Sequence, residues 1–124
     1  MVVARRDDEL AKGVLAKASM LVKRGLCKGA RARDENGDMC HPTSPLAKSF
    51  SILGAVEAVS HGDKKREAVQ LVGEACLTLF GEDVETYNDR EGTTELDAAY
   101  ILSAAGMNGS GLQSVTMPSL RRRA

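Results

Sequence analysis

The strongest structural signal in this chain is the helical spacing of apolar residues between positions 8 and 24. One arc of that helix carries Leu10, Val14, Leu15, Ala18, Leu21 and Val22. Lys12 and Lys23 face away from the arc, Asp7 and Asp8 can cap its start, and Gly25 is placed to end it. An amphipathic helix of this kind has to bury its apolar side against other elements.

The apolar residues elsewhere in the chain also favour packed helices. The sequence has no Trp, and its aromatic residues are Phe50, Phe80, Tyr87 and Tyr100, whereas Ala, Leu and Val recur at helical spacing. An aliphatic core of this kind fits helices packed through small residues better than a β-sandwich. With 124 residues, the chain fits one domain.

Two more helices are predicted by their end signals. The second runs from Pro45 to Val59 with Ser44 as its N-cap, and its apolar residues spread around the axis, so we expect it to be buried at the centre. The third begins at Asp63 as N-cap and ends at Gly81.

A fourth short helix follows the acidic loop. Thr93 or Thr94 caps it, Asp97 completes an arrangement like a capping box, and it runs to about Ala105 before Gly106 ends it.

A short hairpin is predicted between the first and second helices. Asn36 and Gly37, a strong two-residue turn signal, separate residues 30–33 from residues 38–40. The fold class predicted is therefore mainly α, a compact four-helix domain over residues 1–106 with one β-hairpin. Residues 107–124 have loop composition and are predicted to form a C-terminal tail without fixed structure.

Charge is balanced in number and uneven in distribution. Seventeen basic and seventeen acidic residues cancel, yet the stretch from Lys12 to Arg33 holds bases and no acid, and the stretch from Glu82 to Asp97 holds acids with Arg90 as its one base. One interpretation is that both charged stretches form solvated surfaces or neutralise each other in the fold. The other is that one of the two attracts a charged partner.

Features that mark membrane or secreted proteins are missing from the sequence pattern. No apolar run approaches the roughly 20 residues that span a bilayer, and the N-terminus lacks a signal-peptide pattern. Cys27, Cys40 and Cys76 do not form a disulfide framework, so reduced thiols and a cytoplasmic location are expected.

Three segments together resemble an uncharacterised family of small bacterial and bacteriophage proteins, catalogued as a domain of unknown function. They are residues 24–34 with the turn at Asn36 and Gly37, residues 52–56, and residues 87–93. The resemblance spans about residues 10–105, and it implies a mostly helical fold with a small hairpin and no established activity.

The segment from Thr86 to Leu96 is the best candidate for a functional loop. Asn88 and Asp89, before the start of a helix, have the chemistry to bind an anion or orient a water, and Arg90 adds a charged donor. The structural alternative is that Asn88 and Asp89 satisfy their own backbone in a turn while Tyr87 anchors the loop in the core.

No metal site or cofactor is predicted. Cys40 and His41 are adjacent, and the spaced pairs typical of zinc sites do not occur. Cys76 lies on an apolar helical stripe, and Cys27 is also expected to serve packing. No phosphate-binding loop of known spacing occurs either, which argues against nucleotide hydrolysis.

The function predicted from these patterns is that of a non-catalytic accessory module that binds another protein. A more specific form of this prediction is a bacterial or phage protein that acts on a host or defence complex. The expected contact residues are Arg31, Arg33, Asn36, Tyr87, Asn88, Asp89, Arg90, Arg121, Arg122 and Arg123. Two alternatives stay open. One is a small enzyme that uses the Asn88, Asp89 and Arg90 loop, and the other is a protein that binds a nucleic-acid backbone through its basic residues.

Overall fold

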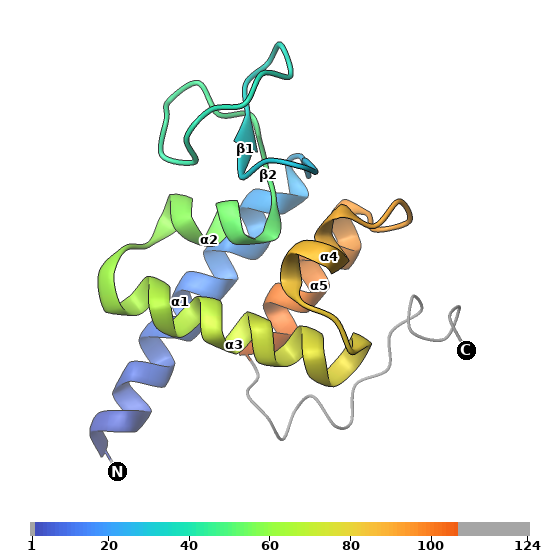
Figure 1. Ribbon diagram of the computed structural model, residues 1–124. Helices are drawn as coiled ribbons and strands as arrows, with labels where there is room; N and C mark the ends of the chain where they lie inside the picture. The colour runs from blue at the N-terminus through green and yellow to red at the C-terminus, as the bar shows by residue number, and fades with distance from the viewer. Residues whose placement is uncertain (1, 107–124) are drawn as a thin grey trace.

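The computed structural model of this protein describes residues 2–106, with side chains from residue 11 onward, and it confirms a mainly helical fold. The elements, in chain order, are α1 Val2–Lys23, β1 Ala32–Arg33, β2 Ser49–Phe50, α2 Ile52–Val59, α3 Gly62–Phe80, α4 Val84–Asp89 and α5 Glu95–Gly106. As Figure 1 shows, the helices pack together while the long connection around β1 and β2 projects from one end of the bundle. The predicted tail, residues 107–124, lies outside the described residues.

The long helix α1 organises the core, because it contacts α2, α3 and α5. The large side chains that are fully buried are almost all aliphatic, and they include Leu15, Val22, Ile52, Val56, Val72, Ile101 and Leu102. Burying one such side chain contributes about 1.5–3 kcal/mol. Alanines at the helix contacts, such as Ala18, Ala55, Ala75 and Ala98, are also fully buried and let the helices approach closely. The predicted aliphatic core with small residues is therefore confirmed.

A two-stranded antiparallel hairpin lies between α1 and α2, as predicted, but its strands differ from the expected ones. Ala32 pairs with Phe50 and Arg33 with Ser49, so β1 pairs with a segment some 17 residues later. The expected pairing of residues 30–33 with residues 38–40 is reduced to a single bridge between Arg33 and Met39. The Asp34 carboxylate accepts the N–H groups of Asn36 and Asp38, which closes the turn.

The start of α2 also differs from the prediction. Ser51 is the N-cap, its hydroxyl accepts the Gly54 N–H at 2.9 Å, and the helix begins at Ile52 instead of Pro45. Residues 49 and 50 are extended because they pair with β1, and the Ser44 hydroxyl caps only a local turn by accepting the Leu46 N–H. Tertiary pairing has thus overridden the local helix signal.

Helix α3 ends where the sequence predicts, and it begins slightly earlier. Gly81 adopts a left-handed conformation with φ of 71°, and its N–H donates to the carbonyls of Cys76 and Leu77. Glycine suits this position because other residues are strained there. His61 occupies the N-cap, so the assignment of Asp63 to that position was wrong, and Asp63 lies in the first turn.

The acidic segment contains an additional short helix, α4, where a loop was predicted. The Asp83 carboxylate caps it by accepting the Thr86 N–H at 3.1 Å. The next helix, α5, has the predicted capping box, since Thr94 and Asp97 exchange backbone and side-chain hydrogen bonds. Thr93, a buried neighbour, fixes the connection by donating its hydroxyl proton to the Tyr87 carbonyl at 2.7 Å.

Candidate functional site

The buried side of α4 is fastened to two distant segments by the amide of Asn88. This side chain is only 2% exposed. Its oxygen accepts the Ile52 N–H at 2.8 Å, and its nitrogen donates to the Cys27 carbonyl at 3.1 Å and to the Asp89 carboxylate at 3.0 Å. One amide therefore satisfies the first N–H of α2 and a carbonyl of the loop after α1. Such a buried, fully satisfied amide is costly to remove.

The residues on either side of the Asn88 link reinforce the same junction. Asp89 accepts the Gly29 N–H at 3.0 Å, and the Lys28 ammonium donates to the carbonyls of Arg90 and Glu91. The Arg90 guanidinium forms an ion pair with Glu82, which joins the two ends of the α4 segment. Together these contacts hold the loop after α1 against the C-terminal end of α4.

Close backbone approach fixes the third part of the junction. Gly54, in the first turn of α2, lies so near the loop that a Cβ placed there would come within 1.8 Å of the Arg31 carbonyl oxygen. The Ser51 N–H also donates to this carbonyl, at 3.0 Å. The three segments that carry the family resemblance thus meet at one place, where residues 27–31, the start of α2 and α4 interlock.

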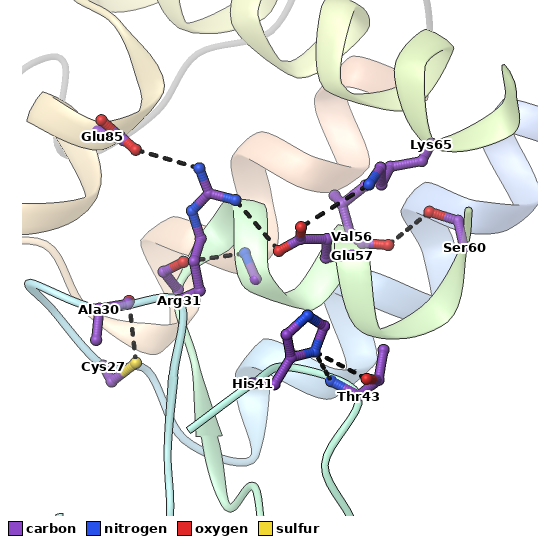
Figure 2. A network of polar contacts seen from close by, with 12 residues as sticks. Cys27, Ala30, Arg31, His41, Thr43, Val56, Glu57, Ser60, Lys65 and Glu85 are labelled. Carbon is purple, nitrogen blue, oxygen red and sulfur yellow. Dashed lines mark hydrogen bonds and ion pairs between the residues drawn. The ribbon is translucent and has the colours of Figure 1, made fainter. Parts of the chain in front are cut away.

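Arg31 leads outward from this junction into a network of exposed charges (Figure 2). Its guanidinium contacts Glu57 at 3.2 Å and Glu85 at 3.5 Å, and Lys65 approaches Glu57 at 3.8 Å. Because Arg31 is about half exposed, these pairs contribute little to stability individually. Through Arg31, the loop before β1 is linked to Glu57 in α2 and to Glu85 on the exposed side of α4.

A small pocket opens at the junction. Its volume is about 220 Å³, and its walls come from the loop at Gly29 and Arg31, the start of α2 at Ser51 and Leu53, and the α4 residues Val84 and Asn88. Asn88 is already bonded to three partners, so the wall that it contributes is part of the fold. This pocket is small in comparison with typical ligand sites of 300–1,000 Å³.

A larger apolar groove lies on the neighbouring surface, between α3 and α4. Its volume is about 370 Å³, and its apolar lining is formed by Leu53, Val69, Leu77 and Val84, with Gly73 on the α3 side. Leu77 is 60% exposed, whereas Val84 at the floor is only 6% exposed. We call this feature the α3/α4 groove.

Every charged side chain that lines the α3/α4 groove, within the residues the structure describes, is acidic: Glu74, Asp83 and Glu85. Acidic residues continue along the outer side of α4, where Asp83, Glu85 and Asp89 line a further shallow hollow together with Arg90. Hydrogen bonds from the side chain and backbone of Thr86 lower the pKa of Asp83, so its carboxylate stays ionised in mildly acidic solution. An apolar floor with an anionic rim suits a ligand that combines apolar and cationic groups.

The structure separates the predicted contact residues into buried and exposed groups. Tyr87 and Asn88 are buried, with the Tyr87 ring stacked on Phe80 at 4.3 Å between centroids, so the prediction that they form contact surface was wrong. The cause is that α4, a helix, turns both side chains inward where a loop was expected.

The other predicted contact residues have different environments. Arg33 donates to the carbonyls of Lys28 and Gly37, which places it in the fold of the loop, whereas Asn36 is exposed on the turn. Arg31, Asp89 and Arg90 are at least partly exposed, and each is already engaged by a neighbour. Arg121, Arg122 and Arg123 lie outside the described residues.

Sequence reasoning missed the groove because its residues belong to separate elements. Leu53 comes from α2, Leu77 from α3 and Val84 from α4, and each has the ordinary spacing of a helical core residue. The available signal was the run of acids after Gly81, which does supply Asp83 and Glu85, but the apolar floor beneath them depends on the packing of α4.

The two buried cysteines, Cys27 and Cys76, have environments that disfavour reaction. Cys76 is fully buried, and burial raises the pKa of its thiol to about 12. Burial likewise raises the pKa of Cys27, although the nearby Ser49 and Arg33 oppose this effect. Among the side chains that the structure describes, residues 11–106, no three of His, Cys, Asp or Glu come together in a way that would hold a metal ion.

The long helix α1 presents a contrasting, basic surface on another part of the molecule. Lys17 and Lys23 are exposed there, together with Met20, and the exposed Arg24 follows directly after the helix. Among the described helices, none is both long enough and apolar enough to cross a lipid bilayer. The predicted basic stretch is thus divided: Lys17 and Lys23 are exposed on α1, whereas Arg31 pairs with Glu85 of α4 and so compensates part of the acidic stretch.

Comparison with known proteins identifies one family. The model of DUF6197, a family of unknown function, matches residues 6–107, which includes all of the helices from α2 onward and most of α1. No curated protein and no solved structure matches the chain significantly.

Proposed function

We propose that this chain, which belongs to the DUF6197 family, is a non-catalytic protein-binding module that accepts a basic, partly apolar segment of its partner in the α3/α4 groove. The observation that carries the proposal is the groove itself, which has a volume of about 370 Å³, an apolar floor and acidic side chains at its edge. Leu77 is the expected anchor, since a large apolar side chain that is 60% exposed gains the most by becoming buried in a complex.

Charge supports a basic partner. Glu74 and Asp83 lie on opposite sides of the groove, on α3 and before α4, and neither is paired with a basic side chain among the described residues. A cationic segment that lies between them gains attraction from both sides, which raises the association rate and selects against acidic partners.

The contacts of Asn88, Asp89 and Arg90, the three residues on which an enzyme would depend, favour a binding function over a catalytic one. Asn88 is committed to backbone groups, Arg90 to Glu82, and Asp89 to the Gly29 N–H. A catalytic role for any of them would require it to leave a contact that holds the junction together.

The test is a titration of the full chain with two synthetic peptides of equal length, one built from Leu and Lys and one from Leu and Glu, followed by fluorescence anisotropy. We expect the basic peptide to bind and the acidic peptide to fail. Leu77→Gln should weaken binding roughly tenfold, which is the loss of one buried Leu contact. Leu96→Gln is the matched control, because Leu96 is a helical leucine that is 72% exposed and lies outside the groove.

A second pair of variants tests the charge. Glu74→Lys should lower the affinity for the basic peptide roughly threefold in low salt. The effect should be smaller in high salt, because exposed charges are screened there. Glu35→Lys makes the same charge change on the exposed turn and should leave the affinity unaltered. Equal affinity for both peptides, or equal effects of Leu77→Gln and Leu96→Gln, would overturn the proposal.

The nucleic-acid alternative has a surface of its own, the exposed bases of α1 and of the residue directly after it. Replacement of Lys17, Lys23 and Arg24 by Gln tests it separately from the groove. If the chain binds single- or double-stranded DNA with an affinity that falls steeply with salt, and these replacements abolish that binding, phosphate contacts are the function and the α3/α4 groove is not.

A further inference from the structure

The α3/α4 groove needs a basic occupant, and this chain carries one in its own sequence. Leu120 is followed directly by Arg121, Arg122 and Arg123, and Leu112, Val115 and Met117 precede them. The segment therefore combines apolar side chains with three adjacent positive charges. These are the two chemical features that the groove's floor and its acidic edge complement.

We propose that residues 107–124 of this chain dock in its own α3/α4 groove, with Leu120 on the apolar floor and the three arginines beside Glu74, Asp83 and Glu85. The contact itself is independent of the proposed function. Its consequence rests on that function: an external basic partner must displace the tail before it binds.

Chain length permits this contact within one molecule. The described fold ends at Gly106, in α5, and α5 packs against α3, the helix that forms one wall of the groove. The residues after Gly106 can span up to roughly 60 Å when fully extended, whereas a domain of this size has a radius of gyration of about 13 Å. The groove is within reach, and a tethered segment has an effective concentration on the order of millimolar.

Charge supports the tail as the occupant over the exposed bases near α1, which include Lys17 and Lys23 in the helix and Arg24 directly after it. A second copy carries the same tail, so it is the tether, which raises the effective concentration, that favours the tail of the same molecule. The tail brings three adjacent arginines, and Arg also pairs with carboxylates in a bidentate geometry that Lys lacks.

The experiment compares two triple variants of the full chain by methyl NMR. The first replaces Arg121, Arg122 and Arg123 by Gln, and the matched control replaces Lys17, Lys23 and Arg24 by Gln. The methyl resonances of Val69, Leu77 and Val84 should shift in the tail variant and stay in place in the control. The wild-type resonances should not change over a tenfold dilution, because the contact is intramolecular.

Three results would overturn the inference. One is a tail variant whose groove methyl resonances match the wild type, the second is an equal shift in the α1 control, and the third is a shift that follows protein concentration, which would assign the groove to a second copy. The Leu and Lys peptide adds an independent measurement, since the tail variant should bind it roughly three- to tenfold more tightly once the competing segment is weakened. If no variant binds the peptide while the methyl shifts occur as expected, the proposed function fails and the tail contact stands.

Discussion

The two sides of the short helix α4 are built for different tasks. The inner side carries Tyr87 and Asn88, which are buried and bonded to the loop after α1 and to the start of α2. The outer side, with Glu85, joins the exposed α3/α4 groove. The residues that attract notice in the sequence hold the fold together, and those that form the accessible surface are ordinary helical residues.

This comparison changes how the family resemblance is interpreted. Residues 24–34, 52–56 and 87–93 are brought together by the Asn88 amide, the Asp89 carboxylate and the close approach of Gly54 to Arg31. The order and spacing of these segments therefore have a structural explanation. Groove residues such as Val69 and Leu77 lie outside all three segments.

The largest effect is expected at the tightest contact of the inner side. Gly54→Ala should lower the free energy of unfolding by about 3 kcal/mol, because the new methyl group would collide with the Arg31 carbonyl and force α2 away from the loop. Gly13→Ala is the control in α1, because a Cβ at this position meets no atom within 4 Å. Since alanine favours the helix more than glycine does, this variant should be more stable by up to about 1 kcal/mol. Chemical denaturation of both variants checks the difference, and equal stabilities would show that the junction is not tightly packed.

The next effect is expected at the buried amide. Asn88→Ala should cost about 2 kcal/mol, since it leaves the Ile52 N–H and the Cys27 carbonyl without their partner in a buried place. Asn36→Ala, at an exposed asparagine, should change stability by less than about 0.5 kcal/mol. Thermal unfolding of the pair provides the measurement. A loss at Asn36 as large as that at Asn88 would remove the distinction between buried and exposed asparagine.

On the outer side, a substitution should affect binding and leave stability nearly unchanged. Leu77→Gln is expected to alter the free energy of unfolding by less than about 0.5 kcal/mol, because the side chain is mostly exposed. The affinity of the same variant for the basic peptide should be roughly tenfold lower. Chemical denaturation gives the free energy of unfolding of Leu77→Gln, and fluorescence anisotropy of the same sample gives its affinity for the peptide. If Leu77→Gln instead unfolds the protein, the groove belongs to the structural side of α4.

The smallest expected effect concerns pH. The pKa of Asp83 in the folded protein is below its ordinary value of 3.8, so its ionised form stabilises the fold above that pH and the contribution is lost as the pH falls through the folded pKa. Asp83→Asn keeps a good N-cap without a titrating group. The wild type should therefore be slightly more stable than the variant near neutral pH, and the difference should disappear in acid. A difference that grows in acid would contradict the assigned cause.

Some features that local sequence determines were predicted correctly, although the first helix begins at Val2 and not at the expected cap of Asp7 or Asp8. The amphipathic period of α1, the left-handed glycine at Gly81 and the capping box at Thr94 and Asp97 each depend on residues within a few positions of one another. The mainly helical class followed from them.

The parts that depend on distant partners were not predicted. Ser49 and Phe50 were assigned to a helix because their pairing with β1 has no local signal. The α4 segment was taken for a loop because Asn88 and Asp89 are typical turn residues, and only the backbone groups of Cys27, Gly29 and Ile52 explain why they occur in a helix. The candidate site inherits this error, since the groove exists only when α4 packs on α3.

The most direct test of the account is an NMR titration of the full chain with the Leu and Lys peptide, recorded through methyl and backbone amide signals. The account predicts that the largest shifts occur at Leu53, Val69, Leu77 and Val84, while the exposed α1 residues Lys17 and Lys23 stay unchanged. Shifts centred on α1 or on the turn at residues 34–37, with the groove signals unmoved, would contradict it.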